Sequence, residues 1–504
     1  MKYLQGQHIL ILGLGSSGLA MTRWCAQMGA DITVADTRES PANLQVLKSE
    51  LPEVQFKSGP FAANLIEGTS VRAVFASPGL APIETLPVIA AAQAMGLWVG
   101  GELSLFVQAL ENLKATRDYA PQVLAITGTN GKTTVTALTG QLIERAGKTV
   151  KVAGNIGPTL LDSLRLSMTT ALPEVWVLEL SSFQLDNAGP FEPSAATVLN
   201  ITQDHLDWHG NMAAYAAAKE KIFGASSLMV LNRDDARVMA MLPEPVRAKL
   251  QKPVVRAHVT YGAEMPQRPG DFGLETVNGM TWLVRALEAD ETRRLRKGEV
   301  EEIHIQRLMP ADALRIRGRH NAVNALAALA LATSTGASLA SMLFGLREYK
   351  GEPHRVEPVA IVNEVEYFDD SKGTNVGATV AALLGLGAER RVVVILGGEG
   401  KGQDFSPLAE PVARYARAVV LIGRDAPLIR EEIKACGVPL IDASTLPEAV
   451  NAAKNMAQAG DAVLLSPACA SFDMFRDYPH RAQVFCQAVA EIAEAAGQVM
   501  EASL

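Results

Sequence analysis

Cysteine is scarce in this chain, which has 504 residues and four cysteines, none of them in a CxxC spacing. So sparse a set predicts neither a disulfide framework nor a thiolate zinc site, and it is typical of a reducing compartment.

Long apolar runs are also missing. No stretch reaches the ~18 residues of a membrane-spanning helix, and Ile9–Leu12 is too short for the apolar part of a signal peptide. We therefore expect a cytoplasmic protein without membrane insertion.

Basic residues are not in excess either. The 46 lysines and arginines stand against 54 aspartates and glutamates, which gives a net charge of -8. Because nucleic-acid-binding proteins usually present a basic face, we do not expect nucleic acid as a partner. The hydrophobic content of 48% is that of an ordinary globular protein, and the length predicts about three domains at ~100–200 residues each.

The chain does contain a repeated alternation of short apolar runs with Ala/Leu-rich stretches. Runs such as HILILGLG, QVLAITGTNG and RVVVILGGEG lead into glycine, as buried parallel strands often do. The stretches between them are long enough for crossover helices, so the predicted fold class is α/β. We place the domains at 1–95, 96–350 and 351–504, with a β-rich insertion at about 242–314 that contains a hairpin around Asn278–Gly279.

The strongest local signal is VLAITGTNGKTTVTALTGQLI. A predicted strand (Val123–Thr127) runs into a glycine-rich turn and then into an amphipathic helix, so that backbone N–H groups and a helix N-terminus surround a phosphate site. Lys132 would reach the β- and γ-phosphates, and the Thr133 hydroxyl would bind Mg2+. The general P-loop motif has a glycine where this chain has Ile126. The alternative is an ordinary strand-to-helix turn with an incidental lysine.

A second glycine motif opens the chain. Gly13, Gly15 and Gly18 form a GxGxxG after a predicted strand, and Asp36 ends the next strand. This pattern is found in NAD-binding domains, but the same geometry places any diphosphate at a helix N-terminus. A lone GxGxxG therefore leaves two alternatives open: an NAD-dependent oxidoreductase, or a site for another diphosphate such as a UDP-sugar.

The loop TGTNGKTT resembles the variant phosphate loop of the Mur ligase and folylpolyglutamate synthase family, and DDSKGTN and LSPACASFDMF resemble C-terminal signatures of its D-glutamate-adding branch. The resemblance implies a Rossmann-like N-terminal domain for a UDP-linked substrate, a central P-loop ATPase domain with a parallel sheet, and a Rossmann-like C-terminal domain that binds the amino acid and closes on ATP. It also implies ligation of D-glutamate to UDP-N-acetylmuramoyl-L-alanine through an acyl phosphate, with ATP and two Mg2+ ions, without NAD, by a monomer.

The family's functional residues can be placed on this chain by motif. For ATP the resemblance implies Gly128, Thr129, Asn130, Gly131, Lys132, Thr133, Thr134, Asn324, Arg355 and Asp370. For catalysis it implies Lys132, His205, Lys219 and Lys372, and for Mg2+ it implies Thr133, Glu179, His205 and Lys219 as a carbamate. Glu179 ends the next predicted strand after the loop, where a carboxylate suits a hard cation. From the residues alone Lys219 is an ordinary helix-surface lysine, and Lys221 is an equally good candidate for the lysine that is carbamylated.

The same resemblance implies separate sets of binding residues for the two substrates. The UDP-linked substrate is expected at Ser16, Ser17, Asp36, Thr37, Arg38, Ser77, Gly79, Asn155 and His205. D-Glutamate is expected at Thr374, Lys401, Ser471 and Tyr478. Cys469 is expected to pack and not to react, because no base is evident nearby. A P-loop regulatory switch is the non-enzymatic alternative, and other members of the family that add L-alanine, diaminopimelate, lysine or a dipeptide also remain open.

Overall fold

The computed structural model describes residues 3–246, 254–289, 302–388 and 390–498. Its N-terminal domain is a parallel sheet in the order β3-β2-β1-β4-β5, covered on both faces by helices. The strands are β1 (His8–Leu12), β2 (Asp31–Asp36), β3 (Gln55–Ser58), β4 (Val71–Ala76) and β5 (Trp98–Gly100), and the helices are α1 (Ser16–Gln27), α2 (Leu44–Glu50) and α3 (Pro82–Ala94). The apolar run of β1 is buried because both faces of the sheet are covered. This is the Rossmann-like arrangement that was predicted.

The central domain contains a second parallel sheet, in the order β11-β10-β9-β6-β8-β7. Its strands are β6 (Gln122–Thr127), β7 (Val150–Gly154), β8 (Val175–Glu179), β9 (Ala195–Val198), β10 (Leu228–Asn232) and β11 (His258–Tyr261). Its helices are α4 (Glu102–Arg117), α5 (Lys132–Arg145), α6 (Leu160–Thr169), α7 (Ser182–Asp186), α8 (Leu206–His209), α9 (Met212–Glu220), α10 (Ala236–Met239), α11 (Arg319–Thr333) and α12 (Leu339–Glu348). The Ala/Leu-rich α11 is buried over most of its length and packs against α5 in one hydrophobic core.

An antiparallel sheet, β12-β13-β14, extends the central domain. Its strands are β12 (Phe272–Val277), β13 (Met280–Glu288) and β14 (Ile303–Pro310). The hairpin predicted around Asn278–Gly279 is confirmed, and both turn residues have positive φ, as a tight two-residue hairpin requires. Leu274, Leu283 and Met309 join the core that contains α5 and α11. Two parts of the predicted insertion, at 247–253 and 290–301, lie outside the described residues.

The C-terminal domain has a sheet in the order β15-β16-β20-β17-β18-β19, parallel except for the antiparallel edge pair β15–β16. The strands are β15 (Glu357–Val362), β16 (Val365–Asp369), β17 (Val392–Gly397), β18 (Ala416–Ile422), β19 (Leu440–Asp442) and β20 (Ala462–Leu465). The helices are α13 (Val376–Gly387), α14 (Ala409–Tyr415), α15 (Ala426–Ile433), α16 (Leu446–Met456) and α17 (Tyr478–Ala495). Short 3-10 helices occur at Ala63–Leu65, Lys221–Phe223, Ala311–Ala313, Ser406–Leu408 and Lys434–Cys436.

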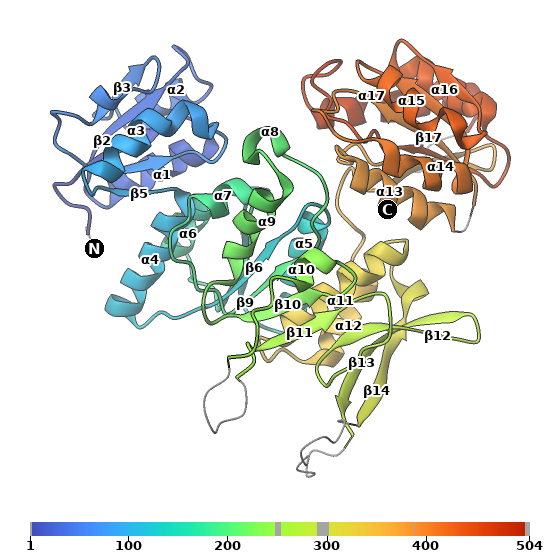
Figure 1. Ribbon diagram of the computed structural model, residues 1–504, viewed down its shortest axis with the longest axis horizontal. Helices are drawn as coiled ribbons and strands as arrows, with labels where there is room; N and C mark the ends of the chain where they lie inside the picture. The colour runs from blue at the N-terminus through green and yellow to red at the C-terminus, as the bar shows by residue number, and fades with distance from the viewer. Residues whose placement is uncertain (1–2, 247–253, 290–301, 389, 499–504) are drawn as a thin grey trace.

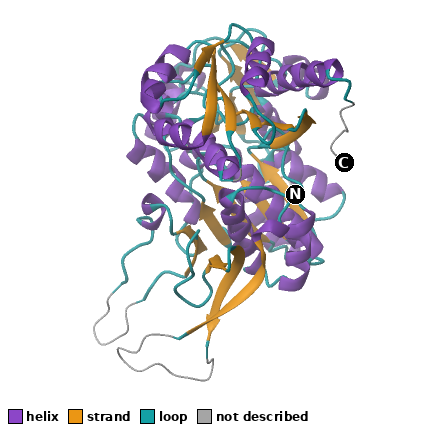
Figure 2. Ribbon diagram, turned by 90° about the vertical axis from the view of Figure 1, so that its right-hand side faces the viewer, coloured by secondary structure: helices purple, strands orange, loops and turns teal. Residues whose placement is uncertain are grey.

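The arrangement of these units decides where a site can form. Figure 1 shows the N- and C-terminal domains on either side of α8, both on the same side of the central domain. In Figure 2, as in Figure 1, the sheet β12-β13-β14 lies at the opposite end of the molecule. The strand β5 pairs with β4, so the first sheet continues past residue 95, where the sequence placed the first division. Across the described ranges, no helix has both the length and the hydropathy to cross a bilayer.

Candidate functional site

The glycine-rich loop lies between β6 and α5, as the sequence predicted. Gly128 has a φ of +151°, and a Cβ on it would lie 2.9 Å from the Leu199 Cβ on the neighbouring chain segment. Gly131 has a φ of +82°, and its Cβ would lie 2.8 Å from Oδ1 of Asn324. Neither position accepts a side chain without strain. The loop therefore presents bare backbone at the N-terminus of α5, which is a suitable setting for a phosphate.

Lys132 is folded back over this loop. Its Nζ donates hydrogen bonds to the carbonyl oxygens of Gly128, at 2.9 Å, and Thr129, at 2.8 Å. Withdrawal from water lowers the pKa of Lys132, while the carboxylates of Glu179 and Asp204 act in the opposite direction. A cation held against the loop is thus already in place where phosphate charge would collect.

Residues of the C-terminal part of the chain reach the loop directly. Nη2 of Arg355 donates to Oγ1 of Thr133 at 2.6 Å. The side-chain amides of Asn130 and Asn375 donate to each other at 3.1 and 3.0 Å, and Asn375 also caps the N-terminus of α13. Asn375 was not among the predicted site residues, although its place directly after Thr374 in SKGTN is a signal that could have indicated it. These bonds hold the C-terminal domain against the phosphate loop.

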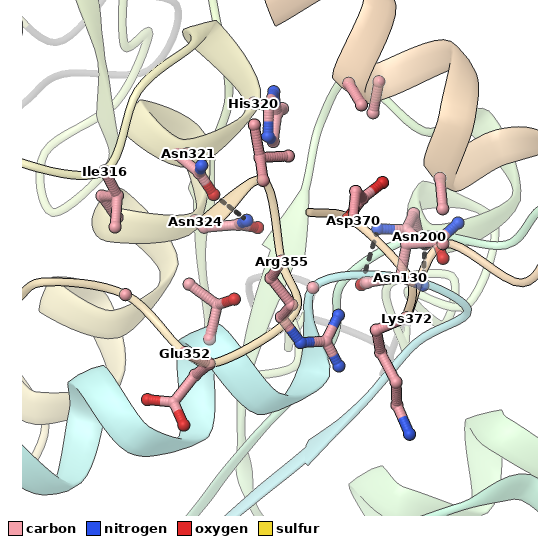
Figure 3. A pocket seen from close by; sticks show the side chains of 18 residues that line it. Asn130, Asn200, Ile316, His320, Asn321, Asn324, Glu352, Arg355, Asp370 and Lys372 are labelled. Atoms are coloured by element: carbon pink, nitrogen blue, oxygen red, sulfur yellow. Dashed lines mark hydrogen bonds between the residues drawn. The ribbon is translucent and has the colours of Figure 1, made fainter. Parts of the chain in front are cut away.

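Two neighbouring cavities share this junction. The first, shown in Figure 3, is lined by Asn130, Gly131, Thr134, Asn200, Ile316, His320, Asn321, Asn324, Gly351, Glu352, Arg355, Val356, Asp370, Lys372, Gly373, Ala378, Ala381 and Ala382. The second is lined by Thr129, Asn130, Gly131, Lys132, Thr133, Asn155, Ile156, Gly157, Glu179, Asp204, His205, Glu352, Pro353, His354, Arg355, Lys372, Thr374, Asn375, Tyr478 and Pro479. Every residue predicted for ATP except Gly128 therefore lines one of these two cavities.

The first cavity has an amide wall and a cationic wall. Asn324 donates to Oδ1 of Asn321 at 3.2 Å on one side, while Arg355 and Lys372 come from the other (Figure 3). Asp370 is 6% exposed and accepts a 2.6 Å hydrogen bond from the Ser466 hydroxyl. Burial raises the pKa of Asp370 to about 7. Amides that bond a base edge next to cations that bond phosphates are a suitable combination for a nucleotide.

Glu179 provides the best-defined place for a metal ion. It ends β8 and is 1% exposed, and its Oε1 accepts a 3.1 Å hydrogen bond from Nδ2 of Asn155. Its Oε2 is buried and accepts no hydrogen bond from any described residue. Buried carboxylate oxygens need a partner, and a hard cation is one. The sequence had placed Glu179 on the next strand of the chain, but β7 intervenes; in the sheet β8 nevertheless pairs directly with β6.

Lys219 is not a surface residue, so the interpretation of its sequence context alone was wrong. It is 1% exposed, because the helix face that carries it packs against the end of β6. Its Nζ donates to the Gly128 carbonyl at 2.9 Å and lies 4.7 Å from the centroid of the Tyr215 ring. Burial, reinforced by repulsion from Lys132, holds the pKa of Lys219 well below its usual value. The alternative candidate Lys221 forms a peripheral ion pair 2.6 Å from Asp186.

His205 lines the second cavity with a φ of +53°. Burial lowers the pKa of its imidazole, although Asp204, with an oxygen 3.6 Å from Nε2, acts in the opposite direction. A neutral imidazole is the form that can ligate a metal. The neighbouring His209, by contrast, is occupied structurally: its Nε2 lies 2.9 Å from the Ser182 hydroxyl, and its ring stacks on Phe183.

A second group of ligand-type side chains is formed by His354, which lines the second cavity, together with Glu357 and Asp369. Nδ1 of His354 lies 2.7 Å from Oδ2 of the buried Asp369. This hydrogen bond raises the pKa of His354 and so favours the imidazolium, which cannot bind a metal. The group is better explained as an internal ion pair that holds the segment before β15.

The residues predicted for the UDP-linked substrate divide into two places. Ser16 and Ser17 begin α1, and Asp36, Thr37, Arg38, Ser77 and Gly79 lie at the same edge of the N-terminal sheet. Asp36 accepts hydrogen bonds from Leu14 N, at 2.7 Å, and from the Arg38 guanidinium. Burial opposes ionisation, but these bonds prevail and lower the pKa of Asp36 to about 2. Asn155 and His205 instead line the cavity at the phosphate loop.

Of the four residues predicted for D-glutamate, two line the second cavity and two line neither cavity. Thr374 and Tyr478 line the second cavity, and Nζ of Lys372 lies 3.9 Å from the centroid of the Tyr478 ring. Burial lowers the pKa of Lys372 to about 8. Lys401 is exposed and Ser471 is buried, and neither lines the two cavities described above. Their roles stay predictions.

Arg481, which sequence reasoning missed, connects the two C-terminal loops of the site. It is 1% exposed and donates to the carbonyl of Cys469 at 3.1 Å and to that of Ser371 at 2.8 Å. Burial lowers its pKa to about 10. Cys469 itself is fully buried in an apolar core, as its predicted packing role requires.

Replacing Arg481 by methionine is expected to destabilise the C-terminal domain by ~2–4 kcal/mol, because two buried carbonyls lose their donors. Urea unfolding followed by circular dichroism measures the loss, and amide hydrogen exchange should accelerate in peptides that contain Ser371 and Cys469. The matched control is Arg476→Met, at an exposed position, with an expected change below ~0.5 kcal/mol. Equal stability of the two variants would contradict the connecting role.

Comparison with known proteins agrees with this geometry. Family models match the chain in three consecutive stretches: "Mur ligase MurD-like, N-terminal domain" at 7–101, "Mur ligase middle domain" at 126–332 and "Mur ligase, glutamate ligase domain" at 354–469. The UDP-N-acetylmuramoylalanine--D-glutamate ligase of Albidiferax ferrireducens is 69% identical over 99% of each chain. The ligase of the same name from Cupriavidus pinatubonensis is 57% identical over 98% of this chain and 99% of that protein.

A solved structure shows the same fold at a greater distance. The UDP-N-acetylmuramate-alanine ligase MurC of Thermotoga maritima superposes with a TM-score of 0.55 and 20% identity, over 96% of this chain and 99% of the other. At that identity the likeness concerns the fold alone. The matched domains and the full-length relatives together decide the assignment: the chain belongs to the Mur ligase family.

Proposed function

We propose that this chain is an ATP-dependent amide ligase that adds D-glutamate to UDP-N-acetylmuramoyl-L-alanine during the synthesis of peptidoglycan precursors. Relatives that bear the corresponding name match it over nearly its whole length. One observation carries the proposal: Lys132 of the phosphate loop and Arg355 and Lys372 of the C-terminal part line a single cavity. Three cationic side chains around one space are suited to the transfer of a phosphoryl group.

The proposed chemistry explains why these cations are needed. A free carboxylate is a poor acyl donor, because its leaving group would be an oxide. Transfer of the γ-phosphoryl group of ATP to a carboxylate oxygen releases ADP and gives an acyl phosphate. The amine of D-glutamate then attacks the acyl carbon, so that a C–N bond forms, a proton is lost and phosphate leaves. Such a reaction depends on positioning and charge neutralisation more than on a protein nucleophile.

Enzymes of this family use ATP with Mg2+. The buried, unpaired Oε2 of Glu179 fits a cation, and we assign Thr133, Glu179, His205 and Lys219 as a carbamate to two ions. Bound Mg2+ would neutralise phosphate charge. The surroundings of Lys219 favour this modification. Burial favours its neutral amine, and CO2 converts a neutral amine into a carbamate, which is an oxygen ligand. The opening glycines are assigned to the UDP diphosphate, so that NAD is not required.

The substrate residues retain the roles that the sequence predicted for them. We assign the start of α1 and the tip of β2 to the uridine diphosphate, and Asn155 and His205 to the part of the substrate that reaches the phosphate loop. Thr374 and Tyr478 are assigned to D-glutamate on the basis of their place in the cavity, and Lys401 and Ser471 are assigned by motif. Location in the cytoplasm and a monomeric state stay predictions.

The expected result is that ADP and phosphate form when the protein, ATP, Mg2+ and UDP-N-acetylmuramoyl-L-alanine are mixed with D-glutamate. L-Glutamate, L-alanine, diaminopimelate, lysine and D-alanyl-D-alanine should give rates at least ~100-fold lower, because a site built for two carboxylates of one chirality leaves polar groups unpaired with the others. A coupled phosphate-release assay measures this. Preference for another acceptor would reject the specific substrate, and no ADP with any acceptor would reject the ligase.

A further inference from the structure

Glu102 is a buried carboxylate between the N-terminal and central domains. It is the first residue of α4 and is 2% exposed. The helices α1, α4 and α6 contact one another. Figure 1 shows them where the N-terminal domain adjoins the central domain. An acidic side chain is seldom fully buried unless it is paired, so its hydrogen bonds indicate what it does.

The polar groups around the Glu102 carboxylate come from both domains. Leu161 N, in the first turn of α6, donates to Oε1 of Glu102 at 3.0 Å. The backbone N–H of Leu160 and the hydroxyl of Ser17, in the first turn of α1, also favour the charged form of the carboxylate. Burial nevertheless raises the pKa of Glu102 to about 7, with these polar groups acting in the opposite direction. The carboxylate thus lies between the N-terminus of α1 and the N-terminus of α6.

Both helix ends lie next to proposed ligand positions. Ser17 is assigned to the uridine diphosphate at the start of α1. The helix α6 follows the loop that carries Asn155, and Asn155 lines the cavity at the phosphate loop and donates to Glu179. A continuous series of contacts therefore runs from Ser17 through Glu102 and α6 to the cavity.

We propose that Glu102 is a positioning residue for the UDP-linked substrate, because it fixes the spacing between Ser17 and the cavity at the phosphate loop. This inference rests on the proposed function, which requires one substrate to span both places. A substrate that spans both places makes all of its contacts only if this spacing is correct, so an altered spacing should weaken its binding and raise its KM. The length of the side chain therefore matters more than its charge.

The test compares Glu102→Asp, which keeps the charge but shortens the side chain, with Glu102→Gln, which keeps the length. Gln can accept from Leu161 N and donate to the Ser17 hydroxyl oxygen. We expect Glu102→Asp to raise KM for UDP-N-acetylmuramoyl-L-alanine ~10-fold and to leave KM for ATP and for D-glutamate within ~2-fold. Glu102→Gln should stay within ~3-fold of the wild type in all three values.

A matched control removes another contact between the same helices. Arg23 of α1 donates to Asp162 of α6 at 3.1 Å, away from Ser17. Arg23→Ala should leave the KM for the UDP-linked substrate within ~2-fold. The inference is overturned if Glu102→Asp leaves that KM unchanged, if Glu102→Gln raises it as much as Glu102→Asp does, or if Arg23→Ala has an equal effect. Inactivity of the wild-type protein with D-glutamate would instead reject the proposed function.

Discussion

Replacing Lys132 by alanine is expected to lower kcat for ADP formation by at least ~1000-fold, the range found when a cation that stabilises phosphoryl transfer is lost. Nζ of Lys132 is held on the Gly128 and Thr129 carbonyls, 2.9 and 2.8 Å away, above the N-terminus of α5. Arg355 and Lys372 line the same cavity, but they come from the C-terminal part of the chain. They cannot replace a charge that is fixed to the loop itself.

Initial rates at saturating ATP, D-glutamate and UDP-linked substrate measure this effect. The matched control is Lys148→Ala, since Lys148 follows the same helix and its Nζ donates to the Thr335 carbonyl at 2.7 Å, away from the cavity. The kcat of the Lys148→Ala variant should stay within ~2-fold of the wild type. A Lys132→Ala variant with raised KM for ATP but unchanged kcat would show that Lys132 binds the ground state only, contrary to the expectation.

The elements that were foreseen most clearly are those whose signal is contiguous. HILILGLG, QVLAITGTNG and RVVVILGGEG became the buried strands β1, β6 and β17, because strands covered on both faces must be apolar throughout. Gln55–Ser58 shows the limit of this signal. As the edge strand β3 it is largely exposed, so its sequence QFKS has no apolar run that would distinguish it from a loop.

The candidate site was foreseen where a motif carried it and missed where only the fold could bring residues together. The motif SKGTN could have indicated Asn375 as a site residue, but nothing local to it encodes its bond to Asn130, 245 positions away. Glu102 has the appearance of an ordinary acidic residue in the first turn of a helix, until α1 and α6 bury it. Relative domain placement depends on the sum of many interfacial contacts, so sequence patterns within one element do not specify it.

Lys219 was indicated by a motif, but its surroundings are visible only in the fold. Its substitution by alanine is expected to lower kcat at least ~1000-fold, because an oxygen ligand next to the transferred phosphate would be lost. The family motif indicated this lysine, but only the structure shows that its Nζ is buried, 2.9 Å from the Gly128 carbonyl. That burial has a chemical consequence. With its pKa held well below the usual lysine value, the amine of Lys219 is neutral over more of the pH range.

The neutral amine is the form that reacts with CO2, so carbamate should accumulate as the pH rises through this lowered pKa. Wild-type kcat should therefore fall in CO2-depleted buffer and recover when bicarbonate is added, whereas Lys219→Ala should not respond to bicarbonate. Lys221→Ala is the control, because this neighbouring lysine is paired with Asp186 at the surface and should keep kcat within ~2-fold of the wild type. If Lys219→Ala kept more than ~10% of wild-type kcat, or if CO2 depletion had no effect on the wild type, the carbamate would not be the catalytically required form of this residue.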